Sequence, residues 1–153
     1  MTDQLLIENH VDGILYLTLN NPDKRNSLSN VLLTKLKDCF DDIQDDPAVR
    51  VVVLRSEGPA FSSGHDLNEL INQDVESYST LFSACTSVME AIRLSPKPVI
   101  AEIQGLATAA GCQLVATCDL AIAWEIRVIR HTWCPDRTVL YHPRGSCFTG
   151  SSD

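Results

Sequence analysis

The chain has 153 residues, of which 44% are hydrophobic and 21% charged, which is typical of one modest globular domain with a buried core. The net charge of −8 disfavours a nucleic-acid partner, and no apolar run approaches the roughly 20 residues of a membrane span. The N-terminal segment has neither a signal-peptide nor a transit-peptide pattern, and the six cysteines include no CxxC pair. These features favour free thiols and a cytoplasmic protein.

The first third of the chain predicts a hairpin, a helix and a buried strand. Residues 4–9 and 14–20 are expected strands joined by an Asp-Gly turn, because apolar and polar residues alternate in the second of them. Ser27 or Ser29 can cap a helix that ends near Pro47. The β-branched run 51–54 is typical of a strand covered on both faces.

The next part of the chain predicts two further helices and two further strands. Asp66 is placed to cap a helix, and apolar residues at 3–4 spacing continue a long amphipathic helix to Ile92. Residues 99–103 are an expected buried strand, 112–117 a short helix and 120–123 a last strand. Strands that alternate with helices in this way indicate an α/β fold with crossover connections.

Two turns of small residues stand out, at 62–66 and 107–111. Each follows an expected buried strand and precedes an expected helix, so each leaves free backbone N–H groups. Turns in neighbouring strand–helix units can point such groups at one spot, which suits a carbonyl oxygen as it becomes an enolate. The alternative is that the small residues only allow close helix–sheet contact.

Three segments together resemble the enoyl-CoA hydratase/isomerase (crotonase) family, in its enoyl-CoA hydratase domain-containing branch. They read NNPDKRNSLS, VVVLRSEGPAFSSGHDLNEL and KPVIAEIQGLATAAGCQLVATCDLAIA. The resemblance implies a crotonase-like ββα spiral fold, of which residues 1–123 would be the N-terminal half. It also implies an acyl-CoA thioester as partner in fatty-acyl-CoA metabolism, no separate cofactor because coenzyme A is part of the substrate, and a homo-trimer or hexamer.

The resemblance also assigns roles to individual residues. The backbone N–H groups of His65 and Ala110 fall where the family holds the thioester carbonyl, so the His65 imidazole is expected to be a bystander. Lys24 and Arg25 lie where the family meets the CoA phosphates, although a solvated loop is an equal alternative. The adenine and pantetheine path is assigned to Ser62, Ser63, Gly64 and Asp66, with Gly111 beside Ala110.

The catalytic carboxylates of the family have no counterpart in this chain. Gln113 occupies the position of the first, and an amide does not transfer protons at neutral pH. The second belongs to a later segment that the chain does not show. Asp119 is expected to have a structural role, so hydration is doubtful and whether the chain is an enzyme stays open. Two alternative reactions are isomerisation and thioester hydrolysis. The chain could instead be a non-catalytic module that binds CoA esters or forms heteromers, or a non-functional fragment.

Residues 124–153 differ from everything before them. They lack periodicity, and we expect an irregular tail outside the family. Codons for residues 130–143, read one nucleotide out of register, can encode a sequence that resembles the segment the family carries at this point. We therefore expect a frameshift near 124–126. His131, Cys134, His142 and Cys147 fit no zinc-finger spacing, so no metal is expected. A truncated domain should also leave apolar side chains such as Leu81, Cys85 and Val88 exposed.

Overall fold

The computed structural model describes residues 4–123, 129–130, 138–142 and 146–150, with side chains described for 4–123. Its main element is a five-stranded sheet whose spatial order is β1-β2-β3-β5-β7. The strands are β1 (Leu6–Val11), β2 (Ile14–Leu19), β3 (Val51–Ser56), β5 (Val99–Ile103) and β7 (Leu120–Ala123). β1 pairs antiparallel with β2 through a turn in which Asp12 and Gly13 both have positive φ, and the remaining pairs are parallel.

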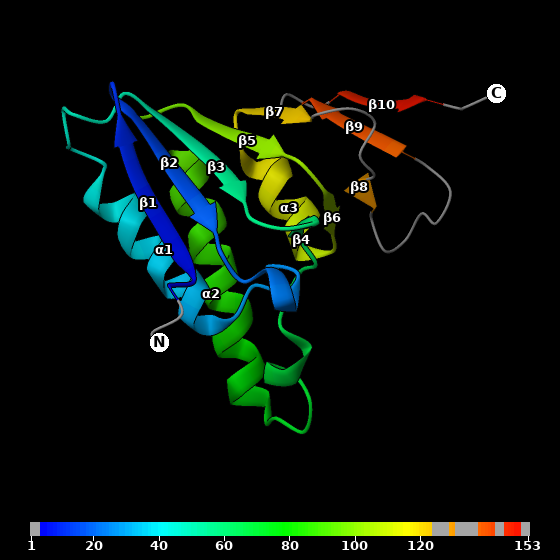
Figure 1. Cartoon of the computed structure of the whole chain (residues 1–153). Coiled ribbons are helices and arrows are strands. Elements are labelled where there is room, and N and C mark those ends of the chain that lie inside the picture. Colours follow the sequence, from blue (N-terminus) through cyan, green and yellow to red (C-terminus); the bar gives the residue numbers. More distant parts are fainter. Residues whose placement is uncertain (1–3, 124–128, 131–137, 143–145, 151–153) are drawn as a thin grey trace.

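Three α-helices make the crossovers between the parallel strands: α1 (Asn30–Asp42), α2 (Val75–Leu94) and α3 (Ala110–Thr117). Figure 1 shows α1 and α2 side by side against one face of the sheet, with α3 near β5 and β7. Ser29, one of the two expected caps, accepts a hydrogen bond from the Leu32 N–H at the start of α1. Two short 3₁₀ turns, η1 (Pro22–Lys24) and η2 (Leu67–Glu69), complete the connections.

A second, smaller sheet lies where two of the parallel strands end. It consists of β4 (Ala60–Ser62), β6 (Leu106–Thr108) and β8 (Ile129–Arg130), in that order. β4 follows β3 and β6 follows β5, so the carboxyl ends of neighbouring parallel strands lead into neighbouring strands of this sheet. The predicted turns, 62–66 and 107–111, begin there.

Several expectations for local structure need correction. The long helix begins at Val75, where Asp74 caps it, and Asp66 instead caps η2. β3 is fully buried on one face only, since Val52 and Leu54 are buried whereas Val51 and Val53 are half-buried. The tail is not wholly irregular, because β8 pairs with β6, and β9 (Thr138–His142) pairs antiparallel with β10 (Ser146–Gly150).

The core lies between the sheet and the helices, and it includes the side chains expected to be exposed. Leu81 and Val88 are completely buried, and Cys85 is 6% exposed. They are covered because α2 packs against both α1 and α3, which lie within the described part of the chain. Exposed apolar side chains occur elsewhere, at Ile71 and Val75 and on both faces of β7.

Two further expectations concern cysteines and membranes. The four cysteines whose side chains are described, at 39, 85, 112 and 118, are free thiols, as predicted. Burial raises the pKa of the Cys118 thiol to about 12. Among the described residues, no helix combines the length and apolar content needed to cross a bilayer.

Candidate functional site

The two predicted turns lie in direct contact. A Cβ built on Gly64 would lie 2.9 Å from the Ala109 Cβ and 3.2 Å from the Ala110 nitrogen. A Cβ on Gly111 would lie 2.5 Å from the Ser62 carbonyl oxygen. Because the turns follow the paired strands β4 and β6, the backbone brings them together, and glycine at both positions is what allows the contact.

Each turn contains a backbone N–H group that is free to bind a ligand. His65 pairs with Leu28 as a parallel bridge, in which the Leu28 N–H donates to the Gly64 carbonyl and the Asp66 N–H donates to the Leu28 carbonyl. The His65 N–H is not used by this bridge. Ala110 is the first residue of α3, where an N–H has no partner within the helix. Within the residues that the structure describes, neither N–H donates a hydrogen bond.

The residue before Ala110 has an unusual backbone conformation. Ala109 has φ 49° and ψ −125°, a combination that residues with a Cβ rarely adopt. Its carbonyl accepts hydrogen bonds from the N–H groups of Cys112 and Gln113. The strain therefore belongs to the peptide that positions the Ala110 N–H, and strain of this kind concentrates at functional sites.

The His65 side chain packs rather than pairs. Its ring meets Phe82 edge to face, with the centroids 5.1 Å apart. The Nδ1 atom is buried and has no hydrogen-bond partner in the described part of the chain. Burial lowers the pKa of the imidazole, while the Glu69 carboxylate opposes this effect. The bystander role of the imidazole stays a prediction.

The residues expected to meet coenzyme A are linked across the first turn. Lys24 Nζ lies 3.1 Å from Asp66 Oδ2, and the Ser63 N–H donates to the Arg25 carbonyl. Lys24 and Arg25 are exposed, whereas Ser62 is fully buried and Asp66 is 5% exposed. The Ser62 Oγ accepts from the Gly64 N–H. The side chain of Ser62 therefore supports the turn and does not line an open path, which corrects its expected role.

Replacing Asp66 by asparagine should lower the free energy of unfolding at neutral pH. It should also reduce the loss of stability that the chain undergoes in acid. Burial alone would raise the pKa of Asp66, but the Asn68 N–H and the Lys24 ammonium outweigh burial and lower the pKa below its ordinary 3.8. The ionised carboxylate therefore stabilises the fold at neutral pH, and this contribution disappears as the pH falls through 3.8 toward the lower folded-state value.

We expect Asp66→Asn to cost about 1 kcal/mol at neutral pH, measured by urea unfolding across the acid range. The difference from the wild type should shrink in acid. Lys24→Met, which keeps the carboxylate and removes its cation, should cost less. A difference between wild type and Asp66→Asn that is the same at neutral and acid pH would contradict this assignment.

Gln113 and His65 both line a pocket of about 400 Å³ between α2 and α3. The amide is exposed there and cannot act as a proton acceptor at neutral pH. Asp119, the other carboxylate considered, accepts a hydrogen bond of 2.8 Å from the Val99 N–H and so links β7 to β5. Its expected structural role is confirmed.

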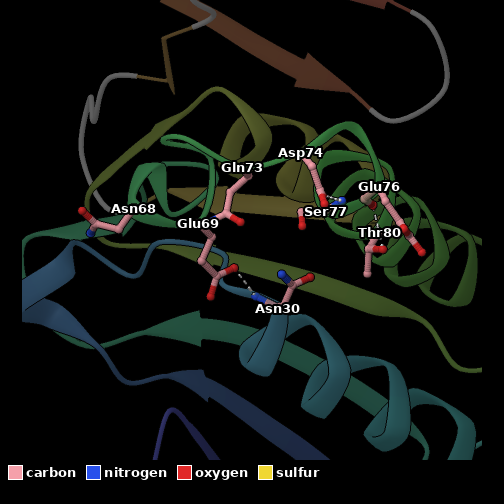
Figure 2. Close-up of a pocket in the computed structure, with 8 residues that line it drawn as sticks. All are labelled: Asn30, Asn68, Glu69, Gln73, Asp74, Glu76, Ser77 and Thr80. Atoms are coloured by element: carbon pink, nitrogen blue, oxygen red, sulfur yellow. Dashed lines mark hydrogen bonds between the residues drawn. The ribbon is translucent and has the colours of Figure 1, made fainter.

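A larger pocket of about 580 Å³ lies elsewhere and contains none of the predicted site residues (Figure 2). Three carboxylates, Glu69, Asp74 and Glu76, line it without a lysine or arginine, and Glu69 accepts from the Asn30 N–H. This charge opposes binding of an anionic ligand, whereas the smaller pocket contains two of the predicted site residues, His65 and Gln113. The described residues contain no cluster of metal-ligating side chains, and those of His131, Cys134, His142 and Cys147 lie outside what is described.

One residue that supports the site was not singled out from the sequence. Asn26 is completely buried and has φ 52°. Its amide donates to the carbonyls of Glu57 and Ala60, and its Oδ1 accepts from the Asn21 N–H, all at 2.8 Å. It thereby joins the Lys24–Arg25 loop to the start of β4. An asparagine in a polar loop before a helix is the available signal, since asparagine tolerates positive φ, but that signal does not reveal burial.

The enoyl-CoA hydratase/isomerase family model matches residues 9–130. The chain belongs to the enoyl-CoA hydratase/isomerase family. It is 47% identical over 114 residues to the human enoyl-CoA hydratase domain-containing protein 3, mitochondrial, a match that covers 74% of this chain and 38% of the relative. The match of the family model ends a few residues beyond the expected boundary at Ala123, and the proposed frameshift stays a prediction.

Solved structures of this family share the fold. The enoyl-CoA hydratase of Mycobacterium smegmatis matches with a TM-score of 0.76 and 49% identity over 78% of this chain and 47% of that one. The enoyl-CoA hydratase of Bacillus anthracis matches with a TM-score of 0.82 and 32% identity, covering 85% and 51%. The expected partial crotonase fold is confirmed, and the chain spans about half the length, or less, of these relatives.

Proposed function

We propose that this chain binds acyl-CoA thioesters, with the His65 and Ala110 N–H groups donating to the thioester carbonyl oxygen. The observation that supports this most strongly is the contact between two turns that each hold an unused N–H. Two preorganised donors stabilise the negative charge that an enolate places on that oxygen. Any L side chain at position 64 would fill the space beside the Ala110 nitrogen, so Gly64 keeps it open.

The charged residues near the two turns indicate where the CoA part of the substrate would bind. Lys24 and Arg25 are exposed cations linked to the first turn and would meet the CoA phosphates. Ser63, whose N–H donates to the Arg25 carbonyl, would line the adenine and pantetheine path. Coenzyme A arrives as part of the substrate, and no other cofactor is proposed. Assembly as a homo-trimer or hexamer and the cytoplasmic location also stay predictions, while the human relative is named as a mitochondrial protein.

A second function, binding without turnover, is favoured by Gln113. Hydration needs a base for water and an acid for the α-carbon, and an amide supplies neither. The wild-type chain should therefore bind a 2-enoyl-CoA without hydrating it. Loss of the enoyl absorbance in the presence of the chain would show catalysis and exclude the purely binding role.

Substitutions at His65 test the proposed carbonyl site, because they separate its N–H from its side chain. His65→Ala keeps the N–H and should leave the affinity for octanoyl-CoA nearly unchanged in calorimetric titration. His65→Pro removes the N–H, which the Leu28 bridge does not use, and should weaken binding about tenfold.

The thermal midpoint of each variant is the control for folding. If His65→Pro remains folded and binds as tightly as His65→Ala, the proposed carbonyl site is wrong. If the wild-type chain folds and binds no acyl-CoA, the proposed function is wrong.

A further inference from the structure

The pocket beside His65 continues as a long groove between α2 and α3. On α2 it is lined by Phe82, Thr86, Met89 and Arg93, which share one face of the helix. On α3 it is lined by Gln113 and Thr117, one turn apart. Arg93 comes eleven positions after Phe82, so the groove follows the helix for about 16 Å.

The middle of the groove suits a chain of methylene groups. The Thr117 hydroxyl lies 3.4 Å from the Met89 sulfur, so α2 and α3 are in contact beside the groove that both residues line. Met89 is half-buried and offers a polarisable, adaptable surface. Phe82, 51% exposed, presents its ring at the end nearest His65.

The two ends of the groove differ in charge. The end near His65 is neutral, because burial keeps the pKa of this imidazole low. At the other end, Arg93 is exposed and is the only cation among the described residues that line the groove. Arg93 makes no ion pair within the described part of the chain, although Glu90 also lines the groove.

We propose that this groove holds the acyl chain and that Arg93 binds a carboxylate at the far end of that chain. The inference rests on the proposed function, which places the thioester carbonyl at His65 and Ala110 and the phosphates toward Lys24. The acyl chain then enters the groove beside Phe82. The guanidinium can bind a carboxylate through two parallel hydrogen bonds, so the preferred substrate class is the monothioester of a dicarboxylic acid.

A pair of thioesters of equal length tests this inference by calorimetric titration. Suberyl-CoA and octanoyl-CoA have the same number of acyl carbons, and only the first ends in a carboxylate. We expect the wild-type chain to bind suberyl-CoA about fivefold more tightly than octanoyl-CoA, a modest gain because Arg93 is exposed. Added salt should reduce the preference.

Three variants locate the source of the preference. Arg93→Gln should abolish it by weakening suberyl-CoA binding alone. Lys35→Gln removes the same charge from an exposed site on α1 and should keep the preference. Glu90→Gln removes from the groove a negative charge that repels the suberyl carboxylate, so it should increase the preference for suberyl-CoA.

The outcomes separate this inference from the function on which it rests. Equal affinity for the two thioesters, or a preference for suberyl-CoA that survives Arg93→Gln, overturns the proposed carboxylate site. In either case, binding of octanoyl-CoA still supports the proposed function. Absence of binding by both thioesters overturns the proposed function and, with it, this inference.

Discussion

Replacing Gly111 by alanine should destabilise the chain by about 2–3 kcal/mol and disrupt the candidate site. The new Cβ would lie 2.5 Å from the Ser62 carbonyl oxygen and 2.7 Å from the Ser62 Cβ, so β4 and α3 would have to separate. The direction of the effect is informative, because alanine is favoured over glycine inside a helix by about 1 kcal/mol. Only the tertiary contact makes this substitution unfavourable.

Thermal unfolding and octanoyl-CoA titration measure the two consequences. We expect the thermal midpoint to fall by about 5–10 °C and the affinity to fall with it, because movement of α3 displaces the Ala110 N–H. Adding Ser62→Gly should restore part of the lost stability, since it removes the clash with the Ser62 side chain. The clash with the carbonyl oxygen of residue 62 would remain. A Gly111→Ala chain as stable as the wild type would show that the two turns are not in contact.

The second large effect is expected at Asn26, where alanine should cost about 2–4 kcal/mol. The substitution removes the Asn26 partner of the Asn21 N–H and of the Glu57 and Ala60 carbonyls, although the Ala60 carbonyl also accepts a 3.3 Å hydrogen bond from the Ser56 hydroxyl. Alanine also tolerates the φ of 52° less well than asparagine does. Urea unfolding measures the loss.

Asn26→Asp is the matched comparison, because it keeps the shape and the acceptor and removes both donors. A carboxylate among carbonyl oxygens is unfavourable when charged, so this variant should be less stable at neutral pH than in mild acid, relative to the wild type. Both variants should also weaken acyl-CoA binding, since Asn26 joins the Lys24–Arg25 loop to β4. Asn26→Ala with wild-type stability would contradict the buried network.

Much of the fold could be predicted from sequence because the signals are local. The Asp-Gly turn, the alternation in β2 and the cap at Ser29 each specify a short segment, and each agrees with the structure. Sequence patterns alone misplace the start of α2 for a related reason. Asp66 and Asp74 are both good caps, and only the backbone between them decides that the first caps a 3₁₀ turn.

The candidate site could be predicted only in part. The small residues at 62–66 and 107–111, together with the resemblance to the family, pointed to the turns and to Gln113. The sequence could not indicate that Ser62 is buried, that Asn26 is a buried junction, or that Ala109 is strained. These properties depend on neighbours far along the chain, such as Ala60 for Asn26 and Gly111 for Ser62.

The sequence by itself determined the family, the order of the helices and of the strands of the main sheet, and the absence of a carboxylate at position 113, because these depend on residue identity and short-range pattern. The short strands β4 and β6 were not predicted from it. Tertiary structure alone decided that two turns more than forty residues apart meet and leave the His65 and Ala110 N–H groups unused among the described residues. It also decided that α2 and α3 enclose a groove with Arg93 at its far end. The physical reason is that parallel pairing of β4 with β6, and packing of α3 on α2, bring together backbone and side chains that no local pattern relates.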